Sequence, residues 1–347
     1  MSFPLQESLS GMDNFLADDL YQAVKKPDIP KLEGFFKAGL SPNHVFTSEK
    51  NADALGKTLL QVATSEKNAD VVKLLIKHGC DVNYGVKKII TPNSTSYRLD
   101  KCVEDLTQTC LFYSICTESV EIVEILTEAG ANVNLECRDK MCALSHAIDT
   151  ENIEIITSIA RMKKCDINAQ DLYGLSPLHI AVIHAKPDIV TLLLRKKAVV
   201  DLEQCQGGSP LFFASDYMTL KSLISYGADP NHRAYNDHGS VTPIYTTLKR
   251  ARDPKIIEAL VEAGAQVTNA VLADGPSTPR ILQEYPDLHA WLKTCHKTPQ
   301  SLKLQTCLKI RDVLRVASNG VGLGVRCRTN QLPLPNVLKH YVHLDHI

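Results

Sequence analysis

Apolar residues recur along the middle of the chain in a pattern that predicts short amphipathic helices arranged in pairs. Val71, Leu74 and Leu75 are typical, because residues three or four positions apart share one face of a helix. Ser176 followed by Pro177 indicates a helix start, since the hydroxyl accepts a free amide N–H and proline fits the first helical position. Glycines such as Gly79 after the second helix allow a left-handed stop.

The same six-residue motif begins each predicted pair. Its copies are Thr58–Ala63, Thr109–Ser114, Cys142–Ala147, Ser176–Ala181, Ser209–Ala214 and Thr242–Thr247, with first residues 51, 33, 34, 33 and 33 positions apart. An earlier unit fits around Ala23 and Asn43, which predicts seven units over residues 13–268. One helix pair has too little partner surface to bury its own apolar face, so the units are expected to stack.

Two features interrupt the repeat. The longest interval exceeds the period by 18 residues, which predicts an insertion near residues 85–106. Lys164 and Lys197 stand where other units have the terminal glycine, and both sites are expected to be strained or to end their helices differently. The small residue at the end of the motif, such as Ala181, is expected to let two helices approach closely.

Composition and charge exclude several function classes. The net charge is −1, so no basic field draws the chain to nucleic acid or to anionic lipid, and no apolar run could span a bilayer. The first eleven residues have neither a basic start nor an apolar core, so we expect no secretory signal. The 11 cysteines lack framework spacing and are expected to be reduced, which favours the cytoplasm and also permits the nucleus.

No arrangement of residues predicts catalysis, a metal site or a cofactor. His179 in the Ser176 motif is expected to hydrogen-bond the backbone between stacked repeats rather than to act as a base. The three-residue spacing of His340, His343 and His346 lacks a Cys or carboxylate partner, so exposed histidines are the expected reading.

Beyond residue 268 the pattern changes twice. Residues 269–298 contain a breaker, Gly275–Pro279, followed by a predicted capping helix through Trp291 and a linker. Residues 299–347 carry a local charge of +5, and one stripe at helical spacing is formed by Leu302, Thr306, Ile310 and Leu314. A proline-fixed element follows, in which the defining positions are Leu332, Pro333, Leu334, Pro335, Leu338 and Tyr341.

These motifs carry a family resemblance. The repeats resemble ankyrin repeats, residues 299–347 resemble a suppressor-of-cytokine-signalling (SOCS) box, and the whole chain resembles the ankyrin-repeat and SOCS-box family. The resemblance implies an all-α fold: an ankyrin solenoid of about seven helix-turn-helix units plus a small helical SOCS box.

The resemblance also implies partners and site residues. Elongin C would contact Leu302, Thr306, Ile310 and Leu314; cullin-5 would contact Leu332, Pro333, Leu334, Pro335, Leu338 and Tyr341. Thr306 occupies the family's cysteine position, with Cys307 one residue later; shifting the register would bury Lys303 and Arg311. Asn83 matches the pattern that ankyrin proteins present to asparaginyl hydroxylases, and its alternative role is that of a turn residue.

The function implied is that of a non-catalytic substrate receptor in a ubiquitin ligase. The repeats would bind a target protein, and the SOCS box would bind elongin C, with elongin B, and cullin-5 with its RING subunit. The alternative is an ankyrin scaffold with a non-functional SOCS box. Target contacts are expected at hairpin tips such as Asp171–Leu175 and Tyr235–Ser240.

Overall fold

The computed structural model describes most of the repeat region and little of the C-terminal segment. The described residues are 13–46, 54, 57–83, 109–136, 140–236, 239–250, 252–268, 272, 278–297, 305, 309, 310 and 313. They fall into two compact units, one ending at Cys165 and the other beginning at Asp166. The predicted insertion at residues 85–106 lies outside the described residues.

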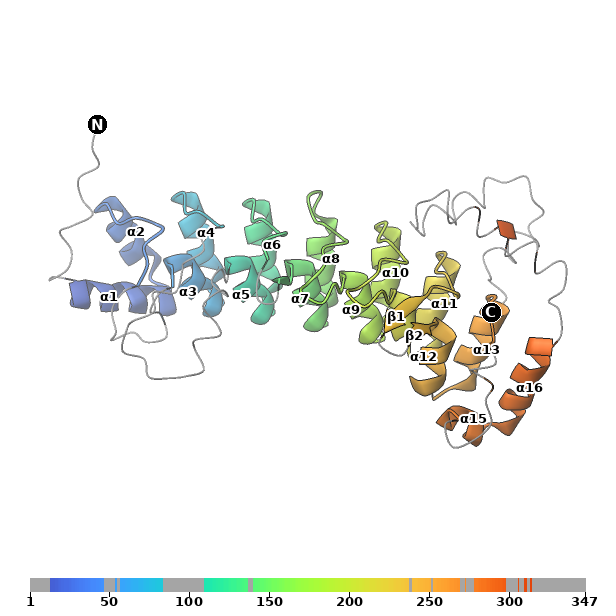
Figure 1. The fold of residues 1–347 in the computed structure, drawn as a ribbon. Coiled ribbons are helices and arrows are strands. Elements are labelled where there is room, and N and C mark those ends of the chain that lie inside the picture. The colour runs from blue at the N-terminus through green and yellow to red at the C-terminus, as the bar shows by residue number, and fades with distance from the viewer. Residues whose placement is uncertain are drawn as a thin grey trace. The chain divides into compact units, whose positions relative to one another are not determined.

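The first unit is a double row of short helices (Figure 1). Its helices are α1 (Asp13–Lys25), α2 (Ile29–Lys37), α3 (Leu59–Ser65), α4 (Ala69–Lys77), α5 (Cys110–Cys116), α6 (Val120–Glu128), α7 (Ala143–Asp149) and α8 (Ile153–Arg161). The inner helices α1, α3, α5 and α7 pack against one another in sequence, and the outer helices α2, α4, α6 and α8 do the same. Four helix pairs therefore stack into two layers.

The second unit repeats this arrangement and then closes it. Its elements are α9 (Pro177–Ile183), α10 (Pro187–Arg195), the 3₁₀ helix η2 (Pro210–Phe213), α11 (Tyr217–Ser225), β1 (Ala234–Asn236), β2 (Gly239–Val241), α12 (Pro243–Arg250), α13 (Pro254–Glu262), α15 (Arg280–Glu284) and α16 (Pro286–Lys297). Here α9, η2 and α12 form the inner row, and α15 packs on α12. The described residues thus contain the seven predicted helix pairs.

Helix starts and close approaches follow the motif. Thr58 and Gln61 form a capping box, in which the Thr58 side chain accepts from the Gln61 amide at 3.0 Å and Gln61 Oε1 accepts from the Thr58 amide at 2.8 Å. The small residues Ala63, Ala147 and Ala181 have no exposed surface, as the predicted close approach of the helices at these positions requires. The core of each unit is the aliphatic surface between its two helix rows.

The repeat that begins at Ser209 differs from the other repeats in its inner helix and in the connection that follows it. The inner helix after Ser209 is only the four-residue η2, and α11 begins eight residues after Ser209, whereas α10 begins eleven after Ser176. The connection from α11 to α12 is correspondingly longer. In it, β1 and β2 pair antiparallel, with Ala234 opposite Val241. The all-α solenoid is confirmed, and this short hairpin is an addition to it that the sequence did not predict; a longer connection can pair its own backbone groups.

The closing region also differs from its prediction. We expected one helix through Trp291, but α15 ends before Tyr285 and α16 begins at Pro286. Proline at that position lacks an amide N–H and disfavours a helical conformation in the residue before it.

Among the helices of the described residues, none combines the length and apolarity needed to span a bilayer.

The two lysines at glycine positions show the two predicted outcomes: Lys197 is strained, and the helix before Lys164 ends differently. Lys197 keeps the left-handed conformation, with φ of +69°. Helix α8 instead ends at Arg161 and is followed by Met162 in an extended conformation, with φ of −63° and ψ of 128°, so Lys164 is not required to adopt a positive φ. Lys197 is therefore strained, and glycine is the residue that would adopt the same backbone conformation without strain.

Lys197→Gly is expected to raise the free energy of unfolding by about 0.5–1 kcal/mol, since a side chain in the left-handed region costs ~1–2 kcal/mol and glycine's greater unfolded-state freedom offsets part of that gain. The measurement is urea unfolding of the full chain followed by circular dichroism. Lys196→Gly is the control: Lys196 has φ of −82°, so this change should destabilise. An equal effect of both substitutions would contradict the strain at Lys197.

Candidate interaction surface

In four of the turns that follow a helix pair, an aspartate or asparagine lies two residues before an asparagine and shapes the turn. Asp81 Oδ1 accepts from the Asn83 amide at 2.9 Å, which closes a local Asx turn. The same contact recurs between Asn132 and Asn134, Asp166 and Asn168, and Asp229 and Asn231. These turns hold the second residue of each pair with its side chain directed at the next repeat.

The side chain at that position joins one repeat to the next. Asn231 donates from Nδ2 to the Gly264 carbonyl at 2.9 Å and accepts at Oδ1 from the Gln266 amide at 2.7 Å. Asn83 makes the matching contacts with the Gly130 carbonyl at 3.4 Å and the Asn132 amide at 2.6 Å. Contacts of the same kind join Asn43 to the Asp81 amide, Asn134 to the Lys164 carbonyl, Asn168 to the Val199 amide and Asp201 to the Asp229 amide. We call these side chains the asparagine ladder.

The ladder bears on the predicted modification of Asn83. Both ends of its amide are engaged by the following repeat, so the turn-residue role is present in the structure. Hydroxylation of Asn83 stays a prediction, and an enzyme that reached this side chain would have to displace those two contacts.

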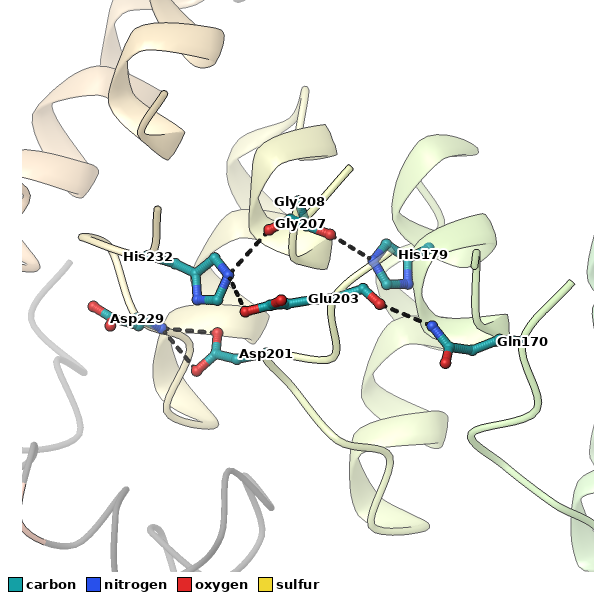
Figure 2. Close-up of polar contacts among 8 residues, drawn as sticks. All are labelled: Gln170, His179, Asp201, Glu203, Gly207, Gly208, Asp229 and His232. Atoms are coloured by element: carbon teal, nitrogen blue, oxygen red, sulfur yellow. Dashed lines mark hydrogen bonds and ion pairs between the residues drawn. The ribbon is translucent and has the colours of Figure 1, made fainter. Parts of the chain in front are cut away.

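His179 is a buried residue of the second unit whose ring contacts the Gly208 carbonyl in the turn of the following repeat, as Figure 2 shows. Its Nδ1 accepts from the Ser176 amide at 3.2 Å, so the neutral ring carries its proton on Nε2, which lies 3.2 Å from the Gly208 carbonyl. Burial lowers the pKa of His179 to about 4, while the hydrogen bond to Gly208 acts in the opposite direction. This geometry supports the predicted structural role between repeats, because the ring has no exposed surface and both nitrogens are occupied.

A second histidine completes the network on the neighbouring turn. His232 Nε2 lies 3.2 Å from the Gly207 carbonyl and 3.2 Å from a carboxylate oxygen of Glu203. Gln170 Nε2 donates to the Glu203 carbonyl at 2.8 Å (Figure 2). It also donates to the Gly174 carbonyl at 2.6 Å. Side-chain hydrogen bonds and one ion pair thus connect adjacent turns between residues 170 and 232.

The predicted tip Asp171–Leu175 is rigid and presents apolar side chains. Asp171 Oδ1 accepts from the amides of Tyr173 and Leu175, both at 2.8 Å, and the Tyr173 carbonyl accepts from Cys205 at 3.1 Å. At Gly174, with φ of +76°, an added Cβ would lie 2.6 Å from the Cys205 nitrogen. Leu172 and Tyr173 nevertheless remain 52% and 65% exposed. Exposed apolar side chains on an ordered turn are typical of protein-binding sites.

The inner-helix face of the first unit carries stacked rings that the sequence did not reveal. The rings of Phe112 and His146 are stacked with centroids 4.4 Å apart, and Cys116 Sγ lies 3.2 Å from His146 Nε2. Burial raises the pKa of the Cys116 thiol and lowers the pKa of His146, so the pair is neutral rather than a thiolate and an imidazolium. In the part of the chain that the structure describes, no three His, Cys, Asp or Glu side chains gather as metal ligands.

The predicted elongin- and cullin-binding positions are almost wholly outside the described residues. Those outside are Leu302, Thr306, Leu314, Leu332, Pro333, Leu334, Pro335, Leu338 and Tyr341. Ile310 is described: it is helical and partly exposed. Of the other predicted tip, Tyr235–Ser240, the structure describes the backbone pairing of β1 with β2.

His179→Gln is expected to flatten the pH dependence of stability between pH 6.5 and 4. In the wild type the folded pKa lies below the unfolded value of 6.5, so stability is full above pH 6.5 and falls by ~3 kcal/mol as the pH drops to 4. Glutamine fits the site, since Gln61 makes the equivalent capping box in α3. It loses the bond to Gly208, which costs ~1–2 kcal/mol at pH 7.

The measurement is the urea unfolding free energy at half-unit pH steps, compared with wild type and with His184→Gln. His184 is exposed, so its variant should follow the wild-type slope. Parallel curves for wild type and His179→Gln would contradict a buried neutral His179.

Comparison with known proteins gives one consistent result. A model of three ankyrin-repeat copies matches residues 83–171 and 156–234, and a single ankyrin-repeat model matches residues 55–85. The solved ankyrin repeat domain of Bcl-3 superposes with a TM-score of 0.53 at 24% identity, covering 70% of this chain and 96% of that one. This likeness shows the shared fold.

Curated relatives match the repeats over part of their own length. The chicken nuclear factor NF-kappa-B p105 subunit is 27% identical over 65% of this chain, human Rabankyrin-5 is 28% identical over 61%, and the Fowlpox virus ankyrin repeat protein FPV031 is 31% identical over 49%. The matches span 27%, 18% and 47% of those proteins. The family-model matches extend over residues 55–234, more than half of the sequence, and the chain belongs to the ankyrin-repeat proteins.

Proposed function

We propose that the chain is a non-catalytic interaction scaffold whose repeats bind a target protein. The observation that carries this proposal is the tip at residues 171–175, where hydrogen bonds fix the backbone while Leu172 and Tyr173 stay exposed. A rigid turn loses little conformational freedom on binding, so its exposed apolar area contributes more of its burial energy to affinity. Ankyrin-repeat proteins are typically interaction domains, which agrees with this role.

We further propose that the scaffold serves a ubiquitin ligase. The support is the sequence of residues 299–347, in which a helical apolar stripe precedes the Leu332–Pro335 element of the SOCS-box pattern. In this proposal Leu302, Thr306, Ile310 and Leu314 bind elongin C in the elongin B/C pair, and the proline element with Leu338 and Tyr341 binds cullin-5. With these partners we propose that the protein works in the cytoplasm, with the nucleus as the second compartment that reduced cysteines permit.

The chemical contribution of such a subunit is proximity. The ubiquitin-conjugating enzyme would carry the reactive thioester, and the scaffold would raise the concentration of target lysines near it. The chain itself needs no catalytic group for this role. The alternative, a scaffold with a non-functional SOCS box, is motivated by the hydroxyl of Thr306 at an apolar position.

Replacing Leu302 and Ile310 together by Asp is expected to abolish recovery of elongin C in a pulldown with the full chain, because two carboxylates would have to enter an apolar pocket. The control changes Lys303 and Cys307 to Asp on the other face of the same segment, and recovery should persist. Equal recovery of elongin C with both double variants would overturn the ligase proposal and leave the scaffold.

Thr306→Cys is expected to strengthen elongin C binding by about tenfold, since a buried hydroxyl without a partner costs ~1–3 kcal/mol and a thiol costs less. Binding is measured by titration calorimetry with purified elongin B/C. Thr306→Ser keeps the hydroxyl and should not gain affinity. If neither wild type nor Thr306→Cys binds, the SOCS box is non-functional.

A further inference from the structure

Basic side chains concentrate at the turn that joins α12 to α13 in the second unit. Lys249 and Arg250 end α12, and Arg252 and Lys255 follow within five residues. All four are exposed. The acid among them, Asp253, caps α13 by accepting from the Lys255 amide at 3.0 Å. The turn therefore carries a strong local positive charge on a chain whose net charge is −1.

Two of these cations are held over aromatic rings. Lys249 Nζ lies 4.4 Å from the ring centroid of Tyr245, one helical turn earlier on α12. Arg250 Cζ lies 5.6 Å from the ring of Phe213, which belongs to η2 in the preceding repeat. The Phe213 ring in turn contacts the buried His179 edge-to-face, with centroids 5.9 Å apart. A cation on a ring face is oriented by the contact and keeps its full charge.

The shortened repeat explains how Arg250 reaches that ring. The inner helix η2 ends at Phe213 after four residues, whereas its neighbours α9 and α12 have seven and eight. Both α9 and α12 pack directly against η2. Arg250 from the longer helix therefore crosses to the end of the shorter one. We call Phe213, Tyr245, Lys249 and Arg250 the cationic face.

The charges of this face are not neutralised within the described part of the chain. Some other basic residues there are paired with acids, such as Lys31 with Asp19, Lys73 with Glu121, and Arg280 on the adjoining α15 with Glu284. No ion pair joins Lys249 or Arg250 to an acid among the described residues. Two oriented, unneutralised cations beside two half-exposed rings form a surface complementary to carboxylates with apolar neighbours.

We propose that the cationic face binds an acidic segment of the target protein. This inference rests on the scaffold function proposed above and assigns the chemistry of the segment that the second unit recognises. Aspartate or glutamate carboxylates would pair with Lys249 and Arg250, and the rings would contact the intervening side chains. The near-neutral chain charge favours an acidic peptide over nucleic acid, which needs a broad positive field.

The test is fluorescence anisotropy of a fluorescein-labelled decaglutamate peptide titrated with the full chain at low salt and pH 7. The double variant Lys249→Glu and Arg250→Glu should weaken binding at least tenfold. The matched control, Arg195→Glu with Lys196→Glu at the end of α10, changes two exposed cations of the same unit and should weaken it less than threefold. Phe213→Leu, which keeps an apolar side chain, should cost about threefold through loss of the ring.

Three results would overturn the inference. They are no binding to the wild type, equal weakening by the two charge-reversal pairs, and stronger binding of an equally long oligothymidine than of decaglutamate. Urea midpoints within error of wild type show that each variant is folded. No elongin or cullin is present, so these outcomes are independent of the ligase proposal.

Discussion

Stacking is the constraint on which the rest of the structure depends. A helix pair built from about seven and nine residues has an apolar face that it cannot cover alone, so each repeat is stable only against its neighbours. The buried alanines permit the close approach, and the asparagine ladder fixes the register by bonding each turn to the next. Stability is then a sum of local interfaces, and a weak interface affects the repeats on both sides of it.

The same constraint makes the surface available for binding. Because the core is satisfied between the helix rows, side chains at the tips and on the inner-helix face are free to vary without loss of the fold. The second unit uses this freedom twice, at Leu172 and Tyr173 on the tip and at Arg250 and Phe213 on the inner row. His179 lies close to the second of these sites, because its ring contacts Phe213 edge-to-face and its Nε2 bonds the Gly208 carbonyl.

Much of the fold could be predicted from the sequence because the repeat signals are local. Helix caps at Thr58 and Ser176, a small residue at Ala181 and the period of 33 depend on neighbouring residues, and the structure agrees with each. The strain at Lys197 was predictable for the same reason, since glycine is the residue that fits its conformation.

The interaction surface could be predicted less well, because it depends on contacts between repeats. The Ser-Pro-Leu start at Ser209 does not distinguish its 3₁₀ turn from the α-helix that follows Ser176, because both repeats begin with these three residues. The pairing of Arg250 with Phe213 joins residues 37 positions apart and follows from that shortening. The tip at residues 171–175 was located by its position in the repeat, whereas its rigidity required the contact with Cys205.

The repeats and the C-terminal motif are under different constraints, because the repeat core does not depend on its exposed side chains. A repeat surface can change its target by substituting exposed side chains, while the C-terminal motif must keep a fixed pattern if it is to fit a shared adaptor. In this chain the cationic face lies mainly on α12, beside the repeat whose inner helix η2 is shortened, and the stack tolerates the shortening because α9 and α12 still pack on η2. Exposed side chains at this junction can therefore vary without loss of the packing that holds the stack together.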